Sequence, residues 1–461
     1  MKFSVLMVFL TMTLLMAQNA ISAESMAAAP SVDFGPPEYA LIGETPAKLT
    51  NAKPNDPLTL DWVLDAAINY HPSLAATWHE IKARQGNAQQ AGLSANPTLF
   101  GEIESFGGSE EYSGTSSMES RIGISQEFQL GGKISKRVRE AEDGVRIADL
   151  EYQVEIVEIK AEVEKRFFEV FTLQELLSLQ KEQVELIRKV HDVVVKRVKT
   201  GDTSPLDLAK SQVELAMAEV ETEQTRKELE AAQYVLASSW GAKFPHFSKI
   251  SAQYQPVQIY TEQELKEALK QSPAWHLMEA QLAKANAALN LAVAESTPDL
   301  ELEGGIQHFN DTNDHAFFMG ISIPLPLFNR NQGGIAEAKA LSRKVHYESE
   351  AGSLILYTEL QKAWQSLASS KNTVKSLESQ VLPIAQNTYK AANKAYKAGE
   401  LDILSLLDAQ RTWVETRRTH LNLLQELESN RIEIERLMGK GAASAPAQSP
   451  KNNDTTKKDL S

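Results

Sequence analysis

The chain has 461 residues, a formal net charge of −14 and no cysteine. The negative charge argues against a nucleic-acid partner, because the phosphate backbone attracts clusters of Lys and Arg. The lack of cysteine excludes disulfides, thiolate metal sites, cysteine nucleophiles and lipid attachment through cysteine within these residues.

The N-terminus has the pattern of a secretory signal peptide. Lys2 is followed by an apolar stretch over residues 3–16, and small residues surround Ala23. The stretch is shorter than the ~20 residues that a membrane-spanning helix needs, and a retained anchor is the alternative. We therefore expect residues 1–23 to be removed on export. Residues 24–57, rich in Ala and Pro, are expected to form an extended arm.

The next part of the chain changes from a helical to an extended pattern. A helix is expected from about residue 58, with a break near His71 and a new start capped by Ser73. The apolar period then becomes two, which predicts a pair of strands over about 97–106 and 118–130.

The stretch from Lys133 to Lys199 predicts one very long helix. It contains no proline, and its apolar residues recur in steps of three and four. At 1.5 Å per residue it would span ~100 Å, far more than an ordinary globular helix. Gly201 then ends this helix, and Ser204 and Pro205 are suited to begin the returning one.

The second half repeats this order after a link over residues 241–260. The expected elements are a helix from 261, a break at Ser272-Pro273, and strands over about 298–309 and 315–326. A long helix follows and ends before Gly399. Pro383 lies inside it and should kink it, because proline removes one backbone hydrogen bond. Residues 440–461 are expected to form a disordered tail.

The two halves are copies of one unit. Gly201 and Gly399 lie 198 residues apart, and the stretch around Gly123 matches that around Gly320 at an offset of 197. Such a repeat is too long for a solenoid, so the two copies should form a single body, although two independent coiled-coil hairpins are the alternative. The expected repeats span 58–240 and 261–439.

Each predicted strand pair has one apolar face and one acidic or small-residue face. Phe317, Met319 and Ile321, for example, alternate with Gly320 and Ser322. The pattern fits a membrane β-barrel, but a half-buried soluble sheet gives the same alternation. Four strands cannot close a barrel, so three chains with twelve strands are the predicted closure. The predicted fold is mainly α with a small β part: a long-helix tunnel plus a trimeric 12-stranded barrel.

Short motifs lie at the strand ends and in the adjoining turns. They are Ala95-Asn96-Pro97, Glu102-Ile103-Glu104, Gln129-Leu130-Gly131-Gly132-Lys133 and Pro326-Leu327-Phe328-Asn329-Arg330-Asn331. With the duplicated order of hairpin, long helix and glycine turn, they resemble the TolC-like outer-membrane efflux factors, and among these the cobalt–zinc–cadmium (CzcC-like) branch. The resemblance implies a homotrimer in a Gram-negative outer membrane, with its helices in the periplasm. The implied partners are a periplasmic adaptor, an inner-membrane RND pump and outer-membrane lipid.

The resemblance also implies roles for residues at the helix tips. The family's periplasmic entrance is lined by positions that are here Asp207, Ser405 and Asp408. Tyr396 is expected to hydrogen-bond to Asp207 and so help to close this gate. Leu401 stands where the family has an arginine, so the arginine that forms a salt bridge in the family's closed gate is missing here. The tip turns are expected to dock the adaptor through Gly201, Gly399, Leu206 and Leu404.

No pattern in the sequence predicts an active site, so we expect neither an enzyme nor a cofactor nor a metal site. His308 and His315 flank a loop that contains Asp311 and Asp314, but a solvated loop is the better interpretation. The segment 131–133 lacks the glycine run and the Ser or Thr of a phosphate-binding loop, which favours a strand-to-helix joint.

The sequence therefore predicts a passive conduit for export, and the resemblance to the CzcC-like branch implies divalent heavy-metal cations as its preferred substrate. A partner must supply the energy, because no nucleotide or proton site is visible. Drug or small-molecule efflux and type I secretion are the alternatives within the same family. A soluble periplasmic coiled-coil adaptor or scaffold is the alternative from another class, but it would need a Gly- and Val-rich β-domain.

Overall fold

The computed structural model describes residues 57–254, 257–258 and 260–440. The expected signal peptide, the arm up to residue 56 and the tail from residue 441 lie outside the described residues. The described chain forms two compact units. The first contains residues 79–150 and 277–352, and the second contains the remaining described residues.

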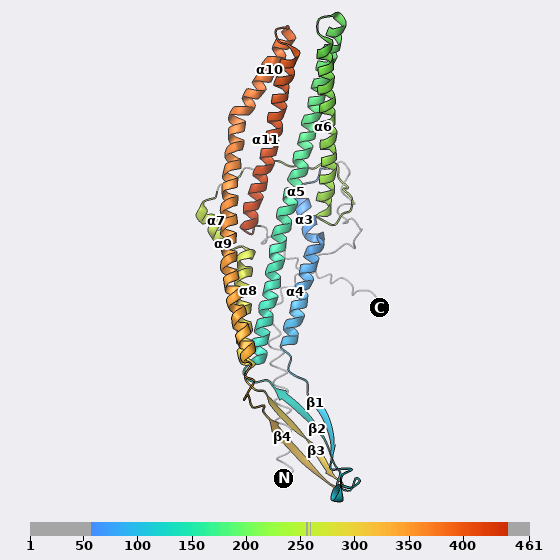
Figure 1. Ribbon diagram of the computed structural model, residues 1–461, viewed down its shortest axis with the longest axis vertical. Coiled ribbons are helices and arrows are strands. Elements are labelled where there is room, and N and C mark those ends of the chain that lie inside the picture. Colours follow the sequence, from blue (N-terminus) through green and yellow to red (C-terminus); the bar gives the residue numbers. More distant parts are fainter. Residues whose placement is uncertain (1–56, 255–256, 259, 441–461) are drawn as a thin grey trace, which may run out of the picture. The chain divides into compact units, whose positions relative to one another are not determined.

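The first unit holds a four-stranded antiparallel sheet, as the sequence predicts. Its strands follow the order β1-β2-β3-β4, so β1 and β4 are its edges (Figure 1). A short 3₁₀ turn, η1 (Glu110–Tyr112), lies between the first two strands. The strands are β1 (Thr98–Glu104), β2 (Glu119–Phe128), β3 (Leu300–Phe309) and β4 (Asp314–Ser322).

The strand register separates apolar from acidic side chains. Ile122 pairs with Ile306, and Ile306 pairs with Phe317, so these side chains share one face of the sheet. Their side chains are largely exposed, so this apolar face has no partner among the residues that the structure describes. The opposite face carries Arg121 among glutamates at positions 102, 104, 119, 127, 301 and 303.

The helices that precede and follow the strands along the chain occur in the predicted order. In the part that the structure describes, no helix combines the length and the apolarity that a bilayer crossing requires. Four helices contribute residues to both units: α4 (Pro72–Ala91), α5 (Lys133–Thr200), α8 (Pro273–Ala294) and α9 (Gln332–Ser376). The others belong to the second unit: α3 (Leu60–Tyr70), α6 (Pro205–Ser238), α7 (Glu262–Lys270), α10 (Leu382–Ala398) and α11 (Ile403–Leu437).

The cores of the second unit show the duplication in three dimensions. One cluster is built around Val163 and Val170 of α5 with Leu236 of α6. A second cluster is built around Leu360 and Leu367 of α9, 197 residues after the two valines. The repeated sequence positions therefore occupy repeated packing positions.

Pro383 distorts its helix, as expected, and the distortion takes the form of a π-helical turn. This turn, η2 (Leu377–Val381), separates α9 from α10. Proline has no N–H to donate to the carbonyl four residues earlier, and a wider turn is one way to accommodate that loss.

The start of α4 differs from the sequence prediction. The helix begins at Pro72, and His71 caps it: the Ser73 N–H donates to His71 Nδ1 over 3.3 Å. The Ser73 hydroxyl instead donates to a carboxylate oxygen of Glu155 on α5. The prediction that Ser73 caps this helix was wrong because a distant glutamate, which local sequence does not reveal, accepts its hydroxyl.

Candidate functional site at the helix tips

Two glycine turns form the tips of the helical unit. Gly201 has φ +80° and Gly399 has φ +77°, the left-handed conformation that side chains with a Cβ disfavour. In each turn the next N–H donates back into the helix: Asp202 to the Arg197 carbonyl over 2.8 Å, and Glu400 to the Ala395 carbonyl over 3.0 Å. Both α5 and α10 therefore end in the same glycine cap.

The returning helices begin with chemically different caps. Ser204 Oγ accepts from the Leu206 N–H over 3.1 Å at the start of α6. Asp402 Oδ1 accepts from the Leu404 and Ser405 N–H groups over 2.9 and 3.0 Å at the start of α11. The hydroxyl of Ser405 donates to Asp402 Oδ2, and these bonds hold the pKa of Asp402 below its usual value. The side chain of Ser405, an expected gate residue, is thus part of a cap.

The two tips share one apolar cluster. Val194 of α5 and Leu208 of α6 pack with Tyr396 of α10 and with Ile403 and Leu406 of α11. Leu206 and Leu404 remain outside this cluster, with 60% and 41% of their surface exposed. The tip turns therefore present leucine side chains to the surroundings on a packed base.

The expected hydrogen bond between Asp207 and Tyr396 is not formed. Asp207 Oδ2 instead accepts from the Thr203 hydroxyl over 2.9 Å. The Tyr396 hydroxyl is buried and has no hydrogen-bond partner among the described residues, while the Arg197 guanidinium lies 5.1 Å from the centre of its ring. The prediction failed because Asp207 accepts from Thr203, four residues earlier in the chain, and this local bond needs no contact between helices.

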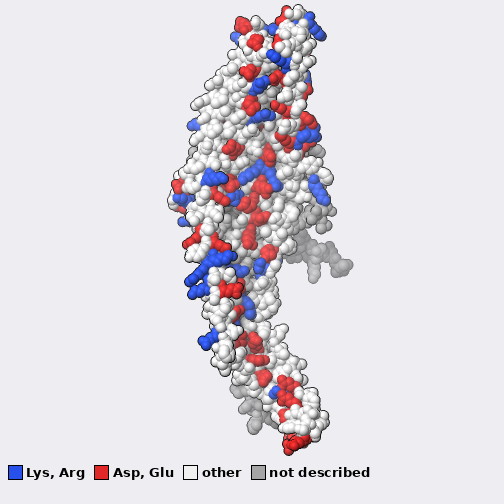
Figure 2. All heavy atoms as spheres, viewed as in Figure 1, with Lys and Arg blue, Asp and Glu red and all other residues white. Residues whose placement is uncertain are grey.

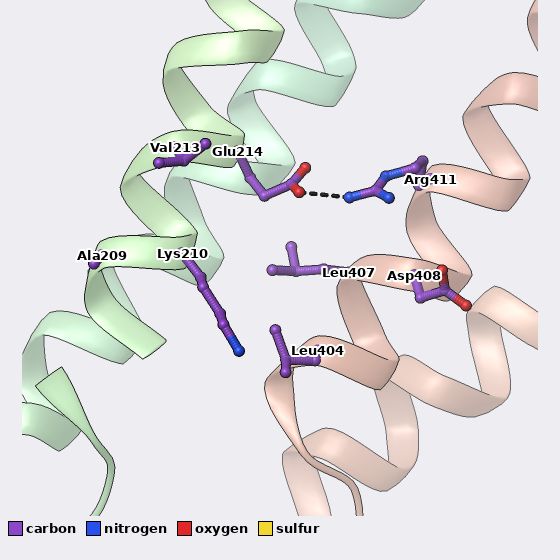
Figure 3. A pocket seen from close by; sticks show the side chains of 8 residues that line it. All are labelled: Ala209, Lys210, Val213, Glu214, Leu404, Leu407, Asp408 and Arg411. Carbon is purple, nitrogen blue, oxygen red and sulfur yellow. Dashed lines mark hydrogen bonds and ion pairs between the residues drawn. The ribbon is translucent and has the colours of Figure 1, made fainter. Parts of the chain in front are cut away.

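A groove of about 460 Å³ lies between α6 and α11 next to the tips. Leu404 and Leu407 point into it from α11, and Lys210 reaches along its other side from α6 (Figure 3). Asp408 lies at its rim, with the carboxylate turned away from α6. The groove thus has an apolar floor and a charged edge.

Ion pairs bridge α6 and α11 one heptad apart. Arg411 contacts Glu214 over 2.5 Å, and Arg418 contacts Glu221 over 3.7 Å (Figure 3 for the first pair). The sequence alone does not predict these links between the two repeats. The signal was present, because each arginine and each glutamate recurs after seven residues, but it identifies a pair only once α6 and α11 are known to be neighbours.

The two histidines of the β3–β4 hairpin do lie together. His308 and His315 face each other across the strands, with ring centres 4.6 Å apart. Among the described residues, however, no group of three or more His, Cys, Asp or Glu side chains is placed to hold a metal ion.

Charge is distributed differently over the two units. On the face drawn in Figure 2, acidic and basic side chains are interspersed over the helices, whereas acidic ones predominate over the strands. This agrees with the strand register, which gives the acidic face of the sheet a single basic residue, Arg121, beside six glutamates.

The chain is similar in sequence to a metal-resistance protein and to a cation efflux protein, and similar in fold to the latter. The chain is 28% identical over 415 residues to the cobalt-zinc-cadmium resistance protein CzcC of Cupriavidus metallidurans, covering 89% of this chain and 98% of CzcC. It is 25% identical over 409 residues to the cation efflux system protein CusC of Escherichia coli K12, covering 82% and 86%. A crystal structure of CusC superimposes with a TM-score of 0.71 at 19% identity, over 82% of this chain and 91% of that one.

The family comparison covers most of the described chain in two segments. The model of the outer membrane efflux protein family matches residues 63–242 and again residues 265–440. Members of this family are channels rather than enzymes. With four antiparallel strands, long helices and an internal duplication in the same order, the chain belongs to the outer membrane efflux protein family and has the TolC-like fold of a Gram-negative outer-membrane channel.

Proposed function

We propose that three copies of this chain form a passive conduit that carries divalent heavy-metal cations out of the cell. The main support for a trimer comes from the sheet. Within one described chain its edge strands β1 and β4 are unpaired, and one of its faces is apolar and exposed. Lipid does not tolerate open strand edges, and about eight strands are needed to close a barrel. Three copies supply twelve strands and close the ring.

The preference for cations rests on charge and on the named relatives. The face of the sheet opposite the lipid carries six glutamates and one arginine, Arg121, which pairs with Glu102 and Glu104. A lumen lined in this way has a negative potential that attracts cations. CzcC is named for resistance to cobalt, zinc and cadmium, and CusC for cation efflux.

The tips are the proposed contact with a periplasmic adaptor, which connects the channel to an inner-membrane RND pump. Leu206 and Leu404 are exposed on a packed base beside the groove between α6 and α11. Apolar anchors next to a groove with charged edges are typical of docking surfaces for helices.

The gate is proposed to be held by the bridges between α6 and α11. Arg411–Glu214 and Arg418–Glu221 connect the helix pair α5–α6 to the helix pair α10–α11. These two helix pairs must separate if the entrance widens. In the proposed closed state these two bridges take the place of the expected Asp207–Tyr396 bond. Asp408, Ser405 and Asp207 remain proposed pore-lining positions.

Gene deletion with complementation tests the substrate class. The deleted strain should lose tolerance to zinc, cobalt or cadmium by several-fold and keep its tolerance to drugs, and the wild-type gene should restore it. Loss of drug tolerance alone would contradict the metal proposal and support drug efflux, the second candidate within the family.

Tip docking is tested in the same strain by Leu206→Ser with Leu404→Ser. Both side chains are exposed, so the fold should persist while adaptor cross-linking and metal tolerance fall. Phe244→Ser, at a residue with 61% exposure in the link after α6, is the matched control. Unchanged cross-linking in the double variant would remove the tips from the docking surface.

A further inference from the structure

Apolar residues continue at every second position beyond the end of β4. Phe317, Met319 and Ile321 lie on the apolar face within the strand, with 69% to 74% of their surface exposed. The strand ends at Ser322, but apolar residues continue at every second position as far as Leu327, which Phe328 follows directly. The later side chains are also exposed: Ile323 50%, Leu325 77%, Leu327 65% and Phe328 91%.

The apolar residues of the paired part of β4 span less than half of the lipid height that the sheet must contact. From Phe317 to Ile321 the strand rises ~13 Å, which gives a height of ~10 Å at the usual tilt of about 40°. The apolar band of an outer-membrane barrel is about 25 Å tall. More than half of that height is therefore left for the apolar residues that follow the strand.

Two prolines and three local hydrogen bonds remove part of the polar backbone of this segment. Pro324 and Pro326 have no N–H, and the Leu327 N–H donates to the Leu325 carbonyl over 2.8 Å. The Pro326 carbonyl accepts from Arg330 Nε over 3.2 Å, and the Phe328 carbonyl accepts from Gln332 Nε2 over 3.0 Å. In hydrocarbon each unsatisfied backbone group costs several kcal/mol, so the prolines and these bonds lower the cost of placing the segment against lipid.

Polar residues follow immediately and mark a boundary. Arg330 folds back onto the segment, and Asn331 Nδ2 donates to the Ala292 carbonyl of α8 over 2.8 Å. An apolar stretch bordered by arginine and asparagine matches the change from acyl chains to headgroups at a membrane surface.

We propose that residues 323–328 form a lipid-inserted collar, whose leucine and phenylalanine side chains pack among the phospholipid acyl chains of the periplasmic leaflet. The collar continues the apolar face of β4 and lengthens it toward the thickness of the bilayer. This inference rests on the proposed function, because it places that face of the sheet against lipid.

The cysteine-free chain allows a direct test by single-cysteine labelling. The full-length protein would carry an environment-sensitive fluorophore at Leu325→Cys or Leu327→Cys, in liposomes with or without brominated phosphatidylcholine. Met319→Cys is the control on the paired apolar face, and Ser322→Cys is the control on the opposite face. These side chains are exposed, so the labels should not disturb a core.

Brominated lipid should quench labels at 325 and 327 within about two-fold of the label at 319, and several-fold more than the label at 322. If 319 is quenched by lipid while 325 and 327 respond only to aqueous iodide, the collar is wrong and the barrel stands. If neither quencher reaches 325 and 327, protein covers them, which also overturns the collar. Absence of lipid quenching at 319 would contradict the barrel itself.

Discussion

At the scale of single residues, Tyr396 shows how a buried hydroxyl without a partner changes what a mutation should do. Tyr396→Phe should leave the melting temperature unchanged or raise it, because an unsatisfied buried polar group costs ~1–3 kcal/mol. The ring and its contact with Arg197 would remain. Thermal unfolding of the purified protein measures the effect.

Tyr260→Phe is the matched control. The Tyr260 hydroxyl accepts from Lys440 Nζ over 2.6 Å and donates to Gln258 over 3.1 Å, so its loss should cost about 1 kcal/mol. An equal loss in Tyr396→Phe would show that the Tyr396 hydroxyl is bonded after all, and would restore a role in the gate.

Asp408 is the residue at which the proposed pore charge can be measured. In a ring of three copies its exposed carboxylate would occur three times near the tips. Asp408→Asn should lower the cation-to-anion permeability ratio in planar bilayers by roughly two-fold, and less at high salt. Glu228→Gln, an exposed carboxylate farther along α6, should leave the ratio unchanged. An unaltered ratio in Asp408→Asn would place Asp408 on the outer face of the helices.

At the scale of elements, α11 is held to its neighbours by ion pairs of very different burial. Arg431 contacts Glu164 of α5 over 2.5 Å and Glu428 over 2.6 Å, and only 12% of its side chain is exposed. Burial raises the pKa of Glu164, and the charge of Arg431 opposes that rise. Arg431→Met should therefore destabilise the fold by ~3–5 kcal/mol, since it leaves buried carboxylates without their counter-charge.

Arg418→Met supplies the comparison on the same helix. Arg418 pairs with Glu221 at the surface, where such pairs contribute ~0–1 kcal/mol. Chemical denaturation of both variants measures the contrast. Similar losses for the two would mean that burial does not govern the strength of these pairs.

The two helix starts at the tips should respond differently to acid. Bonds to Ser405 and Leu404 lower the pKa of Asp402, so its cap is complete above the usual carboxyl pKa and is lost as pH falls through the lowered value. Ser204 does not titrate in this range. Hydrogen-exchange protection between about pH 5 and pH 2 should fall at Leu404 and remain at Leu206. Equal loss at both tips would point to general unfolding.

Elements could be predicted from the sequence where the signal is local and continuous. The run without proline from Lys133 predicts α5, and the left-handed glycines are evident at Gly201 and Gly399. Pro383 indicates a distortion but not its π-helical form. The Arg411–Glu214 bridge and the unpaired Tyr396 depend on which helices are neighbours, and nothing local encodes that.

At the scale of the whole molecule, the proposed channel forms only if copies of the same chain close the sheet into a ring. The edges β1 and β4 are unpaired in one chain, and both carry outward apolar residues, Leu99 and Phe317 among them. Ring closure would pair β4 of one copy with β1 of the next. The same step would create the lumen, align the tips and complete the lipid-facing surface.

Disulfide cross-linking between the edge strands tests this claim most directly. Leu99→Cys would be combined in turn with Phe317→Cys, Met319→Cys and Ile321→Cys, which face the same side of the sheet and are the only cysteines present. After oxidation in the membrane, the pair in register should give dimers and trimers on a non-reducing gel, and no larger species. Monomers for every pair, or a ladder that extends beyond three, would contradict the closed ring of three chains.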